Sequence, residues 1–132
     1  MYSVLRFRDT TGENDLGRLG ADLNTRVPEF YSGPDKRPHR FSCSVSSAAD
    51  VEHHWQTAKE ILERIQDLLP LARRSGIEIW LDLAVYLSDY EGRFLTAVVL
   101  PPGIMTLLAS HEVTLKVSIY AAQSATTPTE ET

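Results

Sequence analysis

The fold is decided by residues 77–87, IEIWLDLAVYL, in which aliphatic side chains take every second position without a break. Successive side chains of a β-strand point to opposite faces, so this pattern places all the strictly aliphatic positions on one face. The other face receives Glu78, Trp80, Asp82, Ala84 and Tyr86. The segment therefore predicts a central strand of an antiparallel sheet with one covered face.

Other segments show the same period-two pattern and are predicted to be strands of the same sheet. Leu5 and Phe7 alternate with polar and aromatic residues near the N-terminus, and Phe41, Cys43 and Val45 alternate with arginine and serines. The predicted strands outside 77–87 are 2–9, 40–46, 94–100 (a short one, after a turn at 88–92) and 113–121, the last with Val113, Leu115, Val117 and Ile119 facing inward.

The clearest helix signal lies in residues 51–72, where apolar residues recur at alternating steps of four and three. Pro70 lies inside this pattern and should kink the helix or end it near Leu69, because proline lacks the amide proton and crowds the preceding turn. A weaker helix is expected over 16–23, and another should begin at Pro101 and Pro102, since proline is favoured in a first helical turn.

Residues 24–40 contain three prolines, one glycine and mixed charges, a composition that predicts a long loop. Loops of this length are commonly functional or mobile. Its aromatic pair, Phe30 and Tyr31, is predicted to anchor the loop on the core, the alternative being a contact offered to a partner.

The order of these elements predicts an α+β fold: an antiparallel sheet of four or five strands with helices packed on one face, a relative of the ferredoxin-like architecture. At 132 residues one hydrophobic core is sufficient. We expect a single domain over 1–122 and a disordered tail over 123–132, where Ser, Thr, Pro and Glu leave little to bury.

The face of this sheet away from the helices should mix aromatic rings with charges of both signs, a composition typical of interface hot spots. An alternative is that these side chains simply pair across strands and stabilise the sheet. The candidate partner-binding residues are Arg40, Glu78, Trp80, Asp82, Tyr86 and Tyr120, within a face that also carries Tyr2, Arg6, Arg8 and Lys116.

Composition and charge narrow the classes of partner. Thirteen Lys and Arg against eighteen Asp and Glu give a net charge of -5, which argues against nucleic acid and allows steering toward a basic protein. No apolar run is long enough for a membrane span or a signal peptide, so neither membrane association nor export is expected. One cysteine, Cys43, excludes an internal disulfide, and we expect a cytoplasmic protein.

The sequence suggests no catalytic, metal or cofactor site. Cys43 falls on the apolar face, where a thiol is inert. His53 and His54 are neighbours and point about 100° apart on a helix, so they are expected to be a surface pair that does not share a metal. No glycine pattern typical of a phosphate-binding loop is present.

The stretch PGIMTLLASHEVTLKVSIY, residues 102–120, resembles the C-terminal signature of a family of small bacterial domains of unknown function. The preceding helix and the 77–87 strand agree with the family plan in order and length. The sequence departs from that plan over 24–40, where the family's glycine and tryptophan pattern does not align. Members of such families are often encoded near polymorphic toxin genes and are regarded as immunity proteins. The resemblance thus implies a bacterial protein that binds and blocks a toxin.

Three functional hypotheses follow. The first is a non-enzymatic protein-binding domain, in particular an immunity protein that occludes a basic toxin. The second is a small-molecule binder or minor enzyme with a pocket between the sheet and the 24–40 loop. The third is a structural homodimer.

Overall fold

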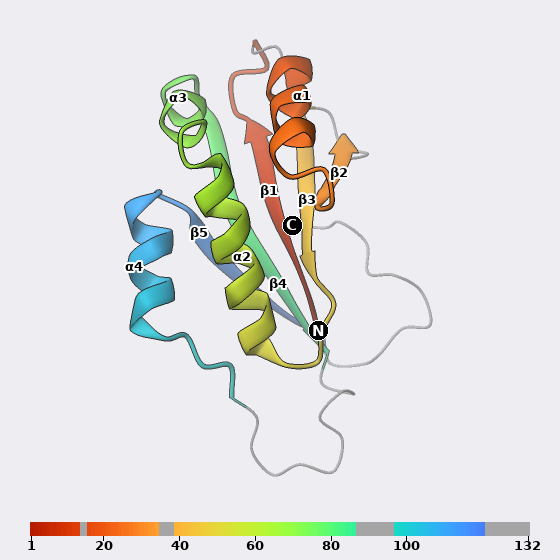
Figure 1. Cartoon of the computed structure of the whole chain (residues 1–132), viewed down its shortest axis with the longest axis vertical. Coiled ribbons are helices and arrows are strands. Elements are labelled where there is room, and N and C mark those ends of the chain that lie inside the picture. Colours follow the sequence, from red (N-terminus) through yellow and green to blue (C-terminus); the bar gives the residue numbers. More distant parts are fainter. Residues whose placement is uncertain (14–15, 35–38, 87–96, 121–132) are drawn as a thin grey trace.

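The computed structural model describes residues 1–13, 16–34, 39–86 and 97–120. The described part of the chain contains both helices and strands, which do not alternate strictly one by one along the sequence (Figure 1). The elements are β1 (Tyr2–Asp9), α1 (Leu16–Arg26), β2 (Tyr31–Pro34), β3 (Arg40–Ser46), α2 (Val51–Ile65), α3 (Leu69–Arg74), β4 (Ile77–Tyr86), α4 (Pro102–Ser110) and β5 (Thr114–Tyr120).

The strands form one five-stranded sheet with the order β2-β3-β1-β4-β5. β1 is antiparallel to both β3 and β4, and β2 is antiparallel to β3. β5, however, runs parallel to β4, so the prediction of a purely antiparallel sheet is wrong at this edge. The reason is the connection: α4 lies between the two strands in the chain, and a crossover through a helix returns the next strand in the same direction.

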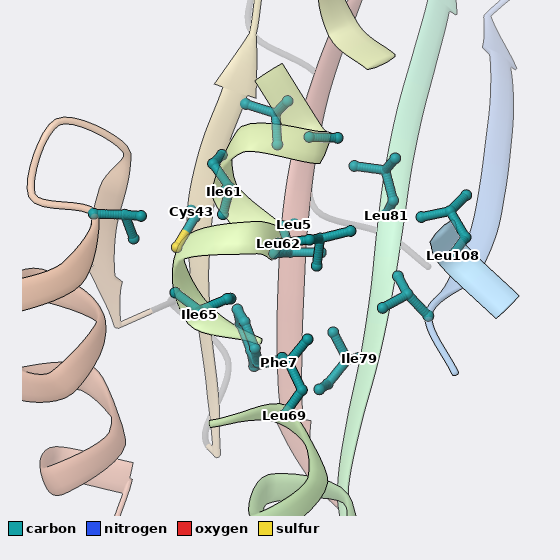
Figure 2. Close-up of a cluster of buried hydrophobic side chains, with 14 of the residues drawn as sticks. Leu5, Phe7, Cys43, Ile61, Leu62, Ile65, Leu69, Ile79, Leu81 and Leu108 are labelled. Atoms are coloured by element: carbon teal, nitrogen blue, oxygen red, sulfur yellow. The ribbon is translucent and has the colours of Figure 1, made fainter. Parts of the chain in front are cut away.

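The described helices lie on one face of the sheet, as predicted (Figure 1). They cover the aliphatic side of β1, β3 and β4, and the buried side chains meet in one continuous core (Figure 2). Phe7 and Phe41 stack at its centre with ring centroids 4.8 Å apart. Leu62 of α2 and Leu81 of β4 are fully buried in the same core, and each such side chain contributes about 1.5–3 kcal/mol by leaving water.

The predicted helix over 51–72 is divided into two. α2 begins after Asp50, whose carboxylate caps the helix by accepting from the backbone N–H of Glu52, and it ends at Ile65. α3 then begins at Leu69 with Pro70 in its first turn. A proline is tolerated there because the first-turn amides have no intrahelical acceptor. The expected kink at Pro70 or helix end near Leu69 is thus replaced by a helix end at Ile65 and a new helix that begins at Leu69.

The prediction of a loop over 24–40 is wrong in part, because α1 continues to Arg26 and β2 pairs with β3. Phe30 and Tyr31 pack against the core, which confirms their role as an anchor. A Cβ atom at Gly20 of α1 would lie 2.6 Å from the Tyr31 hydroxyl oxygen, so a larger residue at this position would require the Tyr31 side chain to shift. Residues 35–38 lie outside the described part of the chain.

At the C-terminal side, α4 begins at Pro102 as predicted and β5 follows it. Residues 97–100 are not in a strand, so the strand predicted over 94–100 is wrong in its described part. The rest of that strand, the predicted turn at 88–92 and the tail at 123–132 lie outside the described residues. Val117 and Ile119 share the side of β5 that faces the helices, yet they are 42% and 66% exposed, so the prediction that they face inward into a covered core is wrong. Within the described residues, no helix is long and apolar enough to cross a membrane.

Candidate functional site

The surface of interest is the face of the sheet opposite the helices, which we call the outer face. The strand registers place the even-numbered residues of β1, β3, β4 and β5 side by side on it. Its members are Tyr2, Val4, Arg6 and Arg8; Arg40, Ser42 and Ser44; Glu78, Trp80, Asp82, Ala84 and Tyr86; and Thr114, Lys116, Ser118 and Tyr120. All six predicted partner-binding residues therefore share one face.

The centre of the outer face is buried, which corrects the expectation that the whole face is open. Trp80, Asp82 and Arg40 are only 8%, 7% and 9% exposed. Part of the cover comes from the face itself, because the Arg40 guanidinium lies over the Trp80 ring, 5.5 Å from its centroid. These three residues are consequently poor candidates for direct contact with a partner in this conformation.

A buried ion pair occupies the same central region. Arg6 Nε donates to Asp82 Oδ2 at 3.1 Å, and both side chains are nearly inaccessible to solvent. Among the described residues, the second carboxylate oxygen of Asp82 has no hydrogen-bond partner. A buried carboxylate is stable only when it is paired, so Asp82 depends on Arg6.

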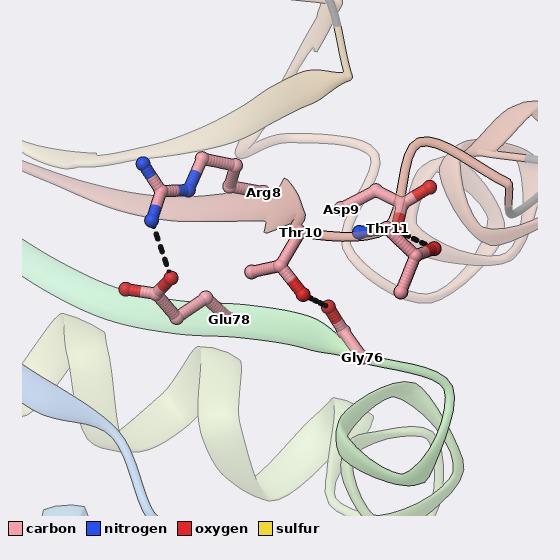
Figure 3. Close-up of polar contacts among 6 residues, drawn as sticks. All are labelled: Arg8, Asp9, Thr10, Thr11, Gly76 and Glu78. Carbon is pink, nitrogen blue, oxygen red and sulfur yellow. Dashed lines mark hydrogen bonds and ion pairs between the residues drawn. The ribbon is translucent and has the colours of Figure 1, made fainter.

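One end of the outer face is charged and accessible. Arg8 and Glu78 form an exposed ion pair of 2.5 Å across β1 and β4 (Figure 3). Next to them is a hollow of about 340 Å³. It is lined by Arg8, Arg40, Glu78, Trp80, Thr114, Leu115 and Lys116. This end therefore offers a carboxylate and several cations to a charged partner or ligand.

At this charged end, one short contact links the end of β1 to the residue before β4, and a second contact is local to the turn after β1. The Thr10 hydroxyl donates to the carbonyl of Gly76 at 2.6 Å, and Asp9 accepts from the backbone N–H and the hydroxyl of Thr11 (Figure 3). Gly76 precedes β4 with φ of 86°, a conformation that glycine adopts readily. The end of β1 is thus tied to the start of β4.

The opposite end of the outer face carries a row of three half-buried tyrosines, which we call the tyrosine row. Tyr2, Tyr86 and Tyr120 come from β1, β4 and β5, and Tyr86 and Tyr120 are directly opposite in the register. The ring centroids are 6.3 Å apart for Tyr2 and Tyr86 and 5.3 Å apart for Tyr86 and Tyr120. The three rings are held by stacking and still retain accessible surface.

Cys43 is fully buried, and burial raises the pKa of its thiol to about 12. The thiolate, which is the nucleophile, is therefore negligible at neutral pH. This agrees with the prediction that Cys43 faces the core.

His54 is not the surface residue that was expected. It is completely buried on α2, where its Nε2 donates to the carbonyl of Ala48 at 2.7 Å and its Nδ1 accepts from the hydroxyl of Ser3 at 2.6 Å. Desolvation by burial lowers its pKa, so the ring is held neutral. Its neighbour His53 is exposed and contacts Ser46. The Ser3 contact joins residues 51 positions apart, so helical spacing alone gave no signal for it.

A second hollow, of about 450 Å³, lies between α1 and α3. It is lined by Arg18, Leu19, Asp22, Leu68, Leu71, Ala72, Ser75 and Ile77. It contains no residue of 24–40, and the outer-face hollow contains only Arg40 from that range. Neither hollow is thus the pocket predicted between the sheet and the 24–40 segment. No group of three His, Cys, Asp or Glu side chains that could hold a metal occurs in the described part of the chain.

A scan against protein-family models, a search of curated proteins and a search of solved structures find no match for this chain. Its described residues define it as an α+β domain with a five-stranded mixed sheet whose described helices all lie on one face.

Proposed function

We propose that this chain is a non-enzymatic bacterial protein-binding domain that acts as an immunity protein, blocking a toxin by occlusion. The resemblance of residues 102–120 to immunity-protein-like domains motivates the class of partner. The observation that carries the binding surface is the tyrosine row, formed by Tyr2, Tyr86 and Tyr120.

Stacked tyrosines are well suited to a protein interface. Tyrosine supplies a large amphipathic contact with few rotatable bonds, and rings already held by their neighbours lose little further entropy on binding. Tyr120 lies on β5 at the end of the strand order, and its ring is on the outer face, from which a partner can approach it. These properties favour the tyrosine row as the centre of the contact.

The charged end of the outer face supplies the second element of the proposal. Glu78 is the exposed candidate carboxylate there, and the chain as a whole carries a net charge of -5. The net charge of the chain favours electrostatic steering of a basic partner, although the charged end itself carries more cations than carboxylates. In this arrangement Tyr86, Tyr120 and Glu78 contact the partner, whereas Trp80, Asp82 and Arg40 support the surface from beneath.

We further propose that β1, α1, β2, β3, α2 and β4 form a ferredoxin-like unit, to which α4 and β5 add one αβ extension. The order β2-β3-β1-β4 with antiparallel neighbours supports this assignment. A single buried cysteine is also consistent with our proposal of a cytoplasmic location, where thiols stay reduced.

The proposal is tested by measuring binding to the toxin-like protein encoded beside this gene. We expect a stable complex that Tyr120→Ala weakens by about tenfold or more, the size of a hot-spot truncation. Tyr120→Phe, which keeps the ring, should bind nearly as well as the wild type. Lys59→Ala, an exposed change on the helical side, is the matched control. Unchanged melting temperatures would exclude unfolding as the cause of weaker binding.

Absence of a complex with the wild-type chain, or wild-type affinity in Tyr120→Ala, would contradict the proposal. The competing hypothesis of small-molecule binding is favoured by the outer-face hollow with Trp80 and Lys116 in its wall. Under this hypothesis, a small anion such as inorganic phosphate should raise the melting temperature of the chain, and Lys116→Gln should reduce that rise.

A further inference from the structure

The edge strand β5 presents a side on which no described strand is paired. β5 bonds to β4 and ends the strand order of the sheet. An edge strand carries a row of backbone N–H and C=O groups that can bind another strand. Proteins commonly protect such edges with a cover, a bulge or charge. On β5 the single charged side chain is Lys116.

Some of the exposed hydrophobic side chains of the described residues lie on this same strand. Val117 and Ile119 lie on the helix side of β5, beyond the cover that α4 provides. Met105 of α4 and Val99, just before α4, are also exposed. Leu71 of α3 is the other large exposed hydrophobic residue in the described part of the chain. An apolar surface beside an open strand edge favours an interface.

We propose that β5 pairs with β5 of a second copy of this chain, antiparallel and centred on Val117, which joins two sheets into one. In this register Val117 faces Val117 of the second copy, and Leu115 faces Ile119 of the second copy. Their side chains all lie on the helix side of the joined sheet. The contact therefore covers the apolar residues that α4 leaves exposed.

The sequence of β5, TLKVSIY, favours this register over registers shifted by one or two residues. A shift by one residue would set the apolar side of one strand against the polar side of the other. Centring the pair on Lys116 would place two ammonium groups directly opposite, which is unfavourable. Centring on Val117 pairs all seven residues of β5 and sets Lys116 against Ser118 of the second copy.

A second copy is favoured over an unrelated strand because this pattern is self-complementary about its centre. Two-fold symmetric contacts use the same patch on both chains, so each residue meets its counterpart across the axis. The inference is independent of the proposed toxin binding, which uses the outer face and the tyrosine row.

The first test is the mass of the purified chain in solution. Sedimentation equilibrium should give a mass that rises toward twice that of one chain as concentration increases. Val117→Glu should give a single-chain mass, because two carboxylates would meet at the axis. Leu71→Glu, the same chemical change at an exposed site on α3, should retain the dimer. A single-chain mass for the wild type at all concentrations would overturn the proposal.

The second test fixes the register by cross-linking under mild oxidation. Directly opposite residues of antiparallel strands have Cα atoms about 4.5–5.5 Å apart, a distance that a disulfide can span. Val117→Cys should therefore form a disulfide-linked dimer efficiently. Ile119→Cys, which faces Leu115 of the second copy, should form little. Cys43 is fully buried and should not compete. Equal cross-linking of the two variants, or greater cross-linking of Ile119→Cys, would overturn this register even if Val117→Glu failed to fold.

Discussion

The two faces of the β1–β4 strand pair are both buried at their centres, but by different chemistry. On the helix side, Phe7 and Leu81 are covered by apolar side chains of α2 and α3. On the outer face, Arg6 and Asp82 are buried as an ion pair beside an arginine–tryptophan contact. The two sets of residues alternate along the same strands.

This difference shows that burial alone does not identify the force that stabilises a face. Apolar burial is non-directional, and its loss scales with the area and cavity created. A buried ion pair depends on both partners, because either charge alone is strongly unfavourable in the interior. Substitutions on the two faces should therefore differ in how they can be rescued.

The largest effect is expected for Phe7→Ala on the helix side. It removes a ring that is stacked on Phe41 and leaves a cavity in the core, so it should lower the free energy of unfolding by about 3–5 kcal/mol. Urea denaturation measures this change. Leu71→Ala, which truncates an exposed aliphatic residue on α3, should cost less than about 0.5 kcal/mol. A loss below about 2 kcal/mol for Phe7→Ala would show that the core closes around the missing ring.

A somewhat smaller effect, about 3 kcal/mol, is expected for Arg6→Met on the outer face. The substitution leaves the Asp82 carboxylate buried without its ion-pair partner. The double variant Arg6→Met with Asp82→Leu should recover most of the lost stability, because it removes both charges. Equilibrium denaturation of the single and double variants measures the coupling between the two residues.

The control for this pair lies on the same two strands, two residues along β1 and four residues along β4. Glu78→Gln breaks the exposed Arg8–Glu78 pair and should change stability by less than about 1 kcal/mol, because water screens it. Equal losses of unfolding free energy in Arg6→Met and Glu78→Gln would show that the buried ion pair depends on its partner no more than the exposed one. That result would contradict the expected difference between the two pairs.

The smallest effect concerns pH and the one histidine buried on the helix side. Burial lowers the pKa of His54 in the folded chain below its usual value of 6.5. The unfolded chain therefore binds the proton more readily, so the contribution of His54 is complete above about pH 6.5 and is lost as the pH falls toward the folded pKa. His54→Gln should flatten the dependence of the unfolding free energy on pH between 7.5 and 5.5, apart from the part due to carboxylates. The exposed His53→Gln variant should keep the wild-type slope, and the same slope in both variants would count against this role for His54.

Sequence patterns predicted the strands and their faces more accurately than the contacts between elements. The strands at 2–9, 40–46, 77–87 and 113–121 were placed within two residues of the observed ends, because alternation is a property of each strand alone. The short strand β2 was missed, since it contains Gly33 and Pro34 and depends on pairing with β3.

The sequence likewise predicted only part of the candidate site. Alternation placed Trp80, Asp82, Tyr86 and Tyr120 on one face, and the structure agrees. The burial of Trp80 and Asp82 was not predicted, because it depends on which side chains of neighbouring strands lie across them. The tyrosine row also required the register that sets Tyr86 beside Tyr120.

The sequence by itself determined the inward and outward sides of each strand, the apolar stripe of α2 and the burial of Cys43. These features follow from the local repeat of two residues in a strand and 3.6 in a helix. Only the tertiary structure decided the parallel direction of β5, the end of α2 at Ile65 and the cover over the centre of the outer face. Those outcomes depend on connections and contacts between residues far apart in the chain, which local periodicity does not encode.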